Sequence, residues 1–453
     1  MFPRLAKITA EKTLITTPIF YINADPHIGH LYTLYLSEYL KRVFKLHMDR
    51  TLAPIPSKEQ RVFLTTGTDE HGEKVLRSAK KHGREIWQHV DSQAAVFKEM
   101  AEKFGIDIDR FIRTTEPDHK RLVNEIWDDL VSKQHIKREY YSGWYSIRDE
   151  TFFNEKELKK NEAGNFVTEE GDPVEMVQEE NYMLKSKDFV ETIPNFIENA
   201  KVYPTKQKGR LSMASAERDI SISRPKKRTS WGVDLNCDES SVVYVWFDAL
   251  INYLTLARQL NLLKGKSLNF NSPTTMINVV GKDIIKFHAL MFPTILKMAS
   301  VTNLDHMVVC HEHWIKDGRK MSKSYGNVVD PFALLQMPHA VEKLKLYFVS
   351  MGPYVHDADF SENQIQVLYS TFVDKIVNCY FRVFSQGFVK KTDFSEVTMA
   401  DLEKDTAFFE AISQKYKVML ESVCLESSPE IVWLKILDYF DYLNQYITIQ
   451  SPF

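Results

Sequence analysis

Cysteine is scarce in this chain, and its few residues lie far apart. The 453 residues include four cysteines, namely Cys237, Cys310, Cys379 and Cys424. None belongs to a CxxC pair, so the sequence predicts neither a disulfide framework nor a zinc site built from thiolates. We therefore expect a protein of a reducing compartment, and we place it in the cytoplasm.

An excess of one charge sign is also missing. The 58 lysine and arginine residues nearly balance the 61 aspartate and glutamate residues, which leaves a formal net charge of −3. Without a global positive field, a nucleic-acid partner would have to be held by local patches. No apolar run reaches the roughly 18 residues of a membrane span, and residues 1–13 lack the apolar core of a signal peptide.

Strand-like and helix-like segments alternate over much of the chain, whose length favours two or three domains. The strand-like runs cover 13–17, 61–67, 242–247, 276–280 and 306–310. Longer apolar segments with helical spacing follow several of them. This alternation predicts an α/β fold with a doubly wound parallel sheet of the Rossmann type.

The alternation of strands and helices is interrupted between about 112 and 240, where the sequence contains short aromatic strand-like runs and charged loops. Beyond 362 the pattern is helical, with one apolar stripe through Val432, Ile436, Tyr439, Leu443 and Tyr446. We therefore expect five parts along the chain. They are two halves of one α/β domain at 1–111 and 241–328, an inserted connective module at 112–240, a linker at 329–361 and an α-helical domain at 362–453.

Two histidines, His27 and His30, flank an Ile-Gly pair directly after the first predicted strand. Asp25 and Pro26 suit the N-cap and the first position of a helix, which would then start at the histidines. Backbone N–H groups at a helix start form a natural phosphate site, and Gly29 leaves room for a close approach. A purely structural role of both imidazoles carries about equal weight while this short motif stands alone.

A second motif, KMSKS, spans 320–324 in a polar stretch flanked by glycines. Its lysines, Lys320 and Lys323, suit a mobile clamp on phosphate groups. A solvated basic loop is the alternative, but a chance match to this string in a chain of this length is roughly one in ten thousand. Together the two motifs favour chemistry on phosphates.

With both motifs present, the chain resembles the class I aminoacyl-tRNA synthetases, whose HIGH and KMSKS signatures appear here letter for letter. The intervening blocks are similar to those of methionyl-tRNA synthetases in particular. These blocks are TTPIFYINADPHIGH, TGTDEHGEK, FIRTT, YSGWYSIRDETFF, EENYM, DISISR, YVWFDALINY and GKDIIKFH. The resemblance covers nearly the whole chain, and the ordered set of blocks carries it.

The resemblance implies a methionine–tRNA ligase that uses L-methionine, ATP with Mg²⁺, and tRNA(Met). It also implies a monomer that contacts no membrane. On this interpretation the α/β domain is catalytic, 329–361 is a stem-contact linker and 362–453 is an anticodon-binding domain. The implied ATP-binding residues are His27, Gly29, His30, Gly281, Asp283 and Lys323. His27, His30, Lys320 and Lys323 would be the catalytic residues.

For methionine, the resemblance implies a carboxylate that holds the ammonium group and an apolar pocket for the thioether. Asp69 would hold the ammonium group, and Arg224 would pair with Asp69. The other implied pocket residues are Ile19, Tyr21, Trp246, Ala249, Tyr253, Ile284 and His288. Without the resemblance, core packing would be the favoured interpretation of Trp246, Tyr253 and Ile284.

Anticodon contacts are implied for Asn378, Arg382 and Phe453. Asn378 and Arg382 are four residues apart, so they share one strip of a predicted helix. An amide beside a guanidinium suits hydrogen bonds to unstacked bases, although a solvent-facing polar pair would be favoured without the resemblance. Phe453 stands where relatives usually have a tryptophan.

Zinc is not expected, although many relatives carry zinc-binding CxxC knuckles in the inserted module. The corresponding places here contain Ser146 and Asp149 and no cysteine. We expect aromatic packing to hold the module instead, around Trp144, Tyr145, Phe152 and Phe153. The run HEH at 311–313 is not interpreted as a metal site, nor the basic run at 224–228 as a nucleic-acid address.

Two other functions keep some weight. A nucleotidylyltransferase of the HxGH type would adenylate a small metabolite, but such enzymes are much shorter and lack KMSKS. A catalytically inactive tRNA-binding relative would not need an intact HIGH motif, an intact KMSKS motif and Asp69. The leucine, isoleucine and valine synthetases carry an editing insertion larger than 112–240.

Overall fold

The computed structural model describes residues 10–51, 60–146, 150–153, 155–168, 171–191, 196–211, 219–321, 326–384 and 405–450. Its centre is a seven-stranded sheet in which every pairing between the described strands is parallel. The strands are β1 (Lys12–Thr16), β2 (Phe20–Tyr21), β3 (Val62–Asp69), β4 (Arg110–Arg113), β10 (Val202–Tyr203), β15 (Thr274–Gly281) and β16 (Leu304–His311). The predicted parallel sheet is confirmed.

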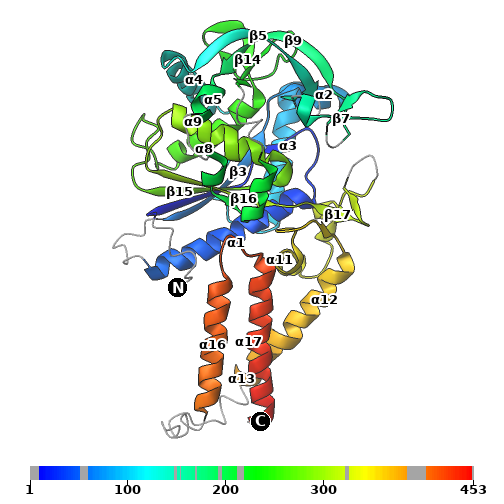
Figure 1. The fold of residues 1–453 in the computed structure, drawn as a ribbon. Coiled ribbons are helices and arrows are strands. Elements are labelled where there is room, and N and C mark those ends of the chain that lie inside the picture. Colours follow the sequence, from blue (N-terminus) through cyan, green and yellow to red (C-terminus); the bar gives the residue numbers. More distant parts are fainter. Residues whose placement is uncertain are drawn as a thin grey trace.

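Helices cover both faces of this sheet, because neighbouring residues of a strand point to opposite sides. In β1, Ile15 packs into one core and Leu14 into the other, and Ile277 and Met276 of β15 divide in the same way. The first core contains α1 (Ile28–Thr51) and α3 (Ile86–Lys103); the second contains α4 (Pro117–Ser132), α8 (Val245–Gln259) and α9 (Phe292–Met298). Figure 1 shows α1 crossing below the sheet and α8 above it.

The inserted region forms its own antiparallel sheets at the top of Figure 1. One sheet has the order β11 (Ile220–Ser221), β9 (Glu175–Leu184), β5 (Ile136–Ser146) and β6 (Thr151–Phe153). Tyr145 and Phe152 pack together there as predicted, with ring centroids 5.0 Å apart. Trp144 packs instead on Phe166, at 4.8 Å.

The strand predicted over 242–247 is wrong in extent and in pairing. The strand β14 (Asp238–Val243) ends before Tyr244, and Trp246 already lies in α8. It pairs antiparallel with β12 (Ser223–Pro225) and β13 (Asp234–Leu235) rather than joining the parallel sheet. The backbone N–H of Tyr244 donates to Ile222 O, which ties the strand end to the inserted region.

Smaller elements complete the upper part of the molecule. They are α2 (Glu73–Lys81), η1 (Glu155–Glu157), β7 (Lys159–Lys160), β8 (Phe166–Val167), α5 (Ser186–Glu191), α6 (Phe196–Asn199), η2 (Thr205–Arg210), η3 (Lys282–Ile284) and the π-helical turn η4 (Phe287–Met291).

A short three-stranded sheet and a set of helices follow the parallel sheet along the chain. The sheet has the order β18 (Arg319–Lys320), β17 (Trp314–Lys316) and β19 (Ala358–Asp359). The helices are α10 (Pro331–Leu334), α11 (Ala340–Met351), α12 (Glu362–Phe372), η6 (Val373–Val377), α13 (Asn378–Phe384), α16 (Thr406–Ser422) and α17 (Pro429–Gln450). Figure 1 shows α16 and α17 side by side below the sheet, which confirms the helical C-terminal region. The exact domain boundaries stay predictions.

Candidate active site

The predicted site residues gather where the parallel strands end. Asp69 is the last residue of β3, and Gly281 is the last residue of β15. Helix α1 begins at Ile28, after β1 and the short strand β2. The carboxyl edge of an open parallel sheet is the usual place for a nucleotide and its substrate.

His27 and His30 cap the first turn of α1. The N-cap is therefore His27 and not the predicted Asp25, although the helix does start at the histidines. His27 Nδ1 accepts from the Gly29 N–H at 3.0 Å, and His30 Nδ1 accepts from the His27 N–H at 3.1 Å. This reciprocal pattern matches the capping box, with imidazoles in place of a hydroxyl and a carboxylate.

The two caps fix the proton positions on both rings. Because Nδ1 is an acceptor in each ring, the neutral form carries its proton on Nε2. The rings of His27 and His30 stack with centroids 3.8 Å apart and planes 24° apart. The arrangement places two ring N–H donors at a helix start, which suits an anionic ligand.

A cluster of aromatic side chains joins α8 to the turn η4. Trp246 stacks on Phe287 with ring centroids 3.8 Å apart and planes 6° apart, and it meets His288 edge-on at 6.4 Å. The Tyr253 hydroxyl lies 2.7 Å from His288 Nε2. The structure thus brings together Trp246, Tyr253 and His288, as predicted, and adds Phe287, which the sequence did not single out.

The His288 ring has a defined tautomer. Its Nδ1 donates to Ile284 O at 3.0 Å, so Nε2 accepts the hydrogen bond from Tyr253. Burial lowers the pKa of His288 to about 4, so the ring is neutral at physiological pH. The π-helical turn η4, which contains His288, is a geometry often found at functional sites.

Asp69 is a buried carboxylate close enough to Tyr253 of this cluster to raise its pKa. It is the strand neighbour of Tyr21, and its Oδ1 is buried with no hydrogen-bond partner among the residues that the structure describes. Burial and the nearby carboxylates of Asp248 and Glu150 raise the pKa of Asp69, whereas Lys74 lowers it less. A cationic donor would relieve both effects.

The predicted ion pair between Asp69 and Arg224 is wrong. The Arg224 guanidinium carbon lies 4.0 Å from the ring centre of Tyr244, and Nη1 donates to Ser223 O at 2.7 Å. Arg224 belongs to β12 of the inserted region, where its guanidinium group stacks on aromatic rings and Nη1 also donates to Ser221 Oγ at 2.9 Å. It therefore packs the region behind the pocket and does not neutralise Asp69.

The sequence did not predict the role of Glu150. This buried side chain accepts from the Tyr21 hydroxyl at 2.8 Å and from the Lys74 N–H at 2.9 Å. Its backbone φ of 50° is left-handed, an uncommon conformation for a residue other than glycine. Tyr21 lies 129 positions away, so no local spacing could have pointed to this contact.

Asp248 was also missed, although it lies between the predicted Trp246 and Ala249. Its two oxygens each lie 2.6 Å from a histidine, His71 on one side and His119 on the other. Burial alone would raise the pKa of Asp248, but the two histidines lower it to about 2. Asp248 therefore stays ionised, and its negative charge lies near enough to Asp69 to raise the pKa of that carboxyl group.

The predicted nucleotide side is partly described. Gly281 leaves room for the Asp283 carboxylate, because a Cβ there would lie 3.0 Å from Asp283 Oδ1. Lys320 ends β18, which pairs with β17, and Lys323 lies outside the described residues. The remaining pocket residues, Ile19 and Ile284, are half-buried, and Ala249 is buried.

The proposed anticodon residues lie far down the helical region. Asn378 is exposed and Arg382 is half-buried on α13, and Arg382 contacts the Thr448 hydroxyl at 3.4 Å. Phe453 lies outside the described residues.

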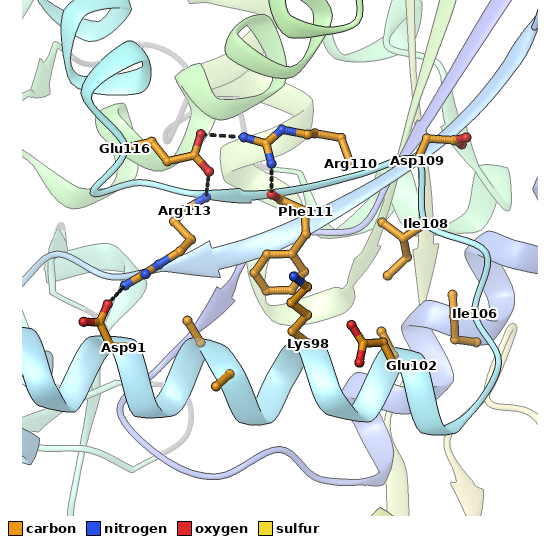
Figure 2. A pocket seen from close by; sticks show the side chains of 13 residues that line it. Asp91, Lys98, Glu102, Ile106, Ile108, Asp109, Arg110, Phe111, Arg113 and Glu116 are labelled. Atoms are coloured by element: carbon orange, nitrogen blue, oxygen red, sulfur yellow. Dashed lines mark hydrogen bonds and ion pairs between the residues drawn. The ribbon is translucent and has the colours of Figure 1, made fainter.

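A separate cavity of about 520 Å³ lies between α3 and β4 (Figure 2). Arg113 and Asp91 form an ion pair of 2.7 Å at its edge, and Arg110 pairs with Glu116. None of the predicted site residues lines it. Its walls carry both charge signs in near balance, so it is not the candidate site.

No group of three or more metal-ligating side chains occurs within the described ranges. The expected absence of zinc stays a prediction, because residues 147–149 of the inserted region are not among them.

The fold and the site together define a class I aminoacyl-tRNA synthetase. A family model described as "tRNA synthetases class I (M)" matches residues 13–384. The chain therefore belongs to the methionine group of class I tRNA synthetases.

Curated relatives and a solved structure agree with this assignment. The chain is 36% identical over 431 residues to a probable mitochondrial methionine–tRNA ligase of Dictyostelium discoideum, covering 90% of this chain and 72% of the relative. It is 35% identical over 448 residues to the mitochondrial methionine–tRNA ligase of Candida albicans, covering 96% and 75%. The structure matches Mycobacterium tuberculosis methionyl-tRNA synthetase in complex with methionyl-adenylate, with a TM-score of 0.79, 29% identity, and coverage of 97% of this chain and 84% of that one.

Proposed function

We propose that this chain is a methionine–tRNA ligase that activates L-methionine with ATP and transfers it to the 3′ end of tRNA(Met). A methionine carboxylate oxygen attacks the α-phosphorus of ATP, and pyrophosphate leaves. A terminal ribose hydroxyl of the tRNA then attacks the methionyl carbonyl carbon, and AMP leaves. Positioning and charge stabilisation carry both steps, since neither needs a side-chain nucleophile.

One observation carries the proposal: the buried carboxylate of Asp69 ends β3 beside Tyr21, and its charge acts on Tyr253, whose hydroxyl contacts His288 in an aromatic cluster. The pocket of Trp246, Tyr253 and His288 suits a thioether, because sulfur packs favourably against aromatic rings. Asp69 Oδ1 suits the methionine ammonium group. An amino acid bound in this way would present its carboxylate on the side of α1.

ATP, as its magnesium complex, would lie along the HIGH turn and the turn at Gly281–Asp283. The Nε2–H donors of His27 and His30 suit the phosphate oxygens, and Asp283 suits the ribose hydroxyls. Lys320 and Lys323 would close over the departing pyrophosphate. The Mg²⁺ ion would share the phosphate charge that develops during this step.

The helical region would read the anticodon through Asn378 and Arg382, with Phe453 stacking on a base. Two features support this role: the exposed amide of Asn378, and the position of Arg382 on the same helix, far from the catalytic pocket. Specific hydrogen bonds rather than bulk attraction would give the selectivity.

Aminoacylation with purified components tests the proposal. The chain should attach methionine to tRNA(Met) in a reaction that needs ATP and yields AMP and pyrophosphate. A nucleotidylyltransferase would instead transfer the adenylyl group to a metabolite and leave tRNA uncharged. A tRNA-binding relative without catalysis would bind tRNA and release no AMP.

The oligomeric state, the zinc content and the cellular location each need a separate measurement. Light scattering should give a monomer of 52.8 kDa. Metal analysis should find well under one equivalent of zinc.

No described helix has the length and apolarity of a membrane span. The predicted cytoplasmic location has no support from the two curated relatives above, which are mitochondrial by name, and cell fractionation would decide between the two compartments.

A further inference from the structure

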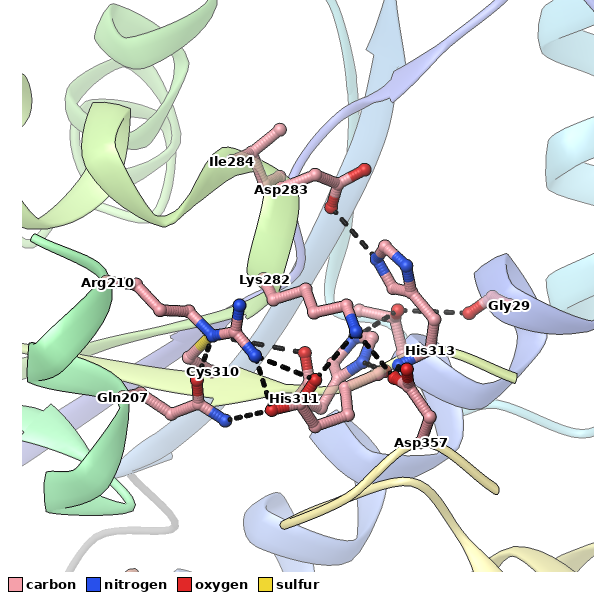
Figure 3. A network of polar contacts seen from close by, with 12 residues as sticks. Gly29, Gln207, Arg210, Lys282, Asp283, Ile284, Cys310, His311, His313 and Asp357 are labelled. Atoms are coloured by element: carbon pink, nitrogen blue, oxygen red, sulfur yellow. Dashed lines mark hydrogen bonds and ion pairs between the residues drawn. The ribbon is translucent and has the colours of Figure 1, made fainter. Parts of the chain in front are cut away.

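The run His311–Glu312–His313 has no part in the function described so far. It lies where β16 ends and leads through β17 towards the KMSKS motif. Each of its three side chains contacts a different part of the molecule. Figure 3 shows His311 and His313 near Lys282 and Asp283.

His311 contacts the HIGH helix. Its Nδ1 donates to the Glu312 carbonyl oxygen at 2.7 Å, so its Nε2 accepts from the Thr33 hydroxyl at 2.9 Å. Gly29 O, in the first turn of α1, accepts from the same Thr33 hydroxyl at 3.1 Å and so shares its one proton with His311 Nε2. Burial lowers the pKa of His311 to about 4, which keeps this neutral tautomer.

Glu312 joins the nucleotide turn to the inserted region. Its buried carboxylate accepts from Lys282 at 2.8 Å, from Arg210 at 2.8 Å and from Gln207 at 3.0 Å. Burial alone would raise the pKa of Glu312, but these three donors lower it to about 2. Lys282 directly precedes Asp283, so Glu312 fixes the turn that carries this residue.

His313 contacts Asp283 itself. Its Nε2 donates to Asp283 Oδ1 at 3.2 Å, and its backbone N–H donates to Asp357 at 2.8 Å. Asp357 also pairs with Lys282 at 2.6 Å. The contacts of Glu312 and His313 therefore converge on one turn from two sides.

We propose that His311, Glu312 and His313 are positioning residues that hold the HIGH turn and the Gly281–Asp283 turn at the separation that ATP requires. The proposal rests on the proposed function, because it takes both turns as the ATP site. A buried ion pair yields little net stability, since desolvation offsets most of its attraction. Its effect here is geometric, and displacements of about 1 Å in such a frame are costly to catalysis.

Isothermal titration with MgATP, and separately with methionine, tests the proposal on the full chain. Glu312→Gln keeps the shape of the side chain and removes the charge that holds Lys282 and Arg210. We expect its Kd for MgATP to rise about tenfold and its Kd for methionine to stay within about twofold. Glu125→Gln, which breaks a surface ion pair with Arg258 on other helices, is the matched control and should change neither constant.

A second pair of variants guards against a folding defect. His313→Ala removes the donor to Asp283, whereas the amide of His313→Gln can replace it. The alanine variant should raise the Kd for MgATP about tenfold, and the glutamine variant should restore it to within about threefold of wild type. If His313 had only a structural role, the glutamine variant would not restore the Kd for MgATP selectively.

Two outcomes overturn the proposal: an unchanged Kd for MgATP in both Glu312→Gln and His313→Ala, or an equal rise in both ligand constants. Failure of the proposed function has a different signature, which is absence of methionine-dependent pyrophosphate exchange in the wild-type chain. MgATP binding is measured without methionine. The titration therefore tests the positioning proposal, whereas the exchange assay tests the proposed function.

Discussion

His27 and His30 cap the same helix turn for each other, each accepting through Nδ1 and leaving Nε2 as the protonated edge. One pair of side chains therefore has two tasks. It completes the start of α1, and under the proposed function it also donates two N–H groups to phosphate oxygens.

Substitutions of His27 should separate these two tasks. Asparagine is a good N-cap but has no donor at the Nε2 position, and alanine lacks both. We expect both variants to lower pyrophosphate exchange by about 10²-fold. Only His27→Ala should also lower the free energy of unfolding, by about 1 kcal/mol in urea denaturation. Wild-type exchange in His27→Asn would show that the ring does not act on phosphate.

Methionine binding should weaken at acidic pH because of Asp69. Burial and the neighbouring carboxylates raise its pKa, so the carboxyl group takes up a proton at a higher pH than an ordinary aspartate. The protonated form cannot pair with an ammonium group, so the binding constant should fall towards tenfold per pH unit below that raised pKa.

Titration calorimetry between pH 5.5 and about 8 measures this dependence. Asp69→Asn should bind methionine weakly at every pH. His288, whose pKa is about 4, stays neutral throughout this range and cannot cause the change. A wild-type affinity that does not vary with pH would remove Asp69 from the ammonium site.

Lys323 should act mainly in the transition state. We expect Lys323→Ala to lower the exchange rate by about 10²–10³-fold while methionine affinity stays the same. Lys297→Ala, at an exposed position of α9, is the control. Equal rates for the two variants would rule out the phosphate clamp.

Arg382 should act through tRNA alone. We expect Arg382→Ala to reduce aminoacylation strongly, with pyrophosphate exchange within about twofold of wild type. Lys415→Ala, another cation of the helical region, should leave both activities near wild type. A parallel loss of exchange and aminoacylation in Arg382→Ala would indicate a structural role for this residue.

The sequence predicted the sheet well, because a parallel sheet buried on both faces leaves a strong local pattern. The runs at 13–17 and 276–280 are the strands β1 and β15, paired in register. The same reasoning failed at 242–247, where apolar residues of one run divide between a strand and the first turn of α8. Periodicity alone cannot distinguish a short buried strand from a buried helix start.

The site was less predictable where contacts cross the inserted region. Trp246 and Tyr253 have helical spacing, as do Ile284 and His288, so each pair was expected to share a face. That the two pairs meet was implied by the family resemblance and not by their spacing. The contact between Glu150 and Tyr21 depends on the tertiary fold, as does the stacking of Arg224 on Tyr244. Arg224 was expected to pair with Asp69, but its guanidinium group stacks on Tyr244 and donates to Ser223 O and Ser221 Oγ instead.

Pyrophosphate exchange with each of the twenty amino acids tests the central claim most directly. A pocket of aromatic rings beside a buried carboxylate should give ATP exchange with methionine and without tRNA. Leucine, isoleucine and valine should be about 10²-fold less effective, which is near the limit for apolar discrimination. Exchange that is driven equally well by another amino acid, or no exchange with methionine, would contradict the account.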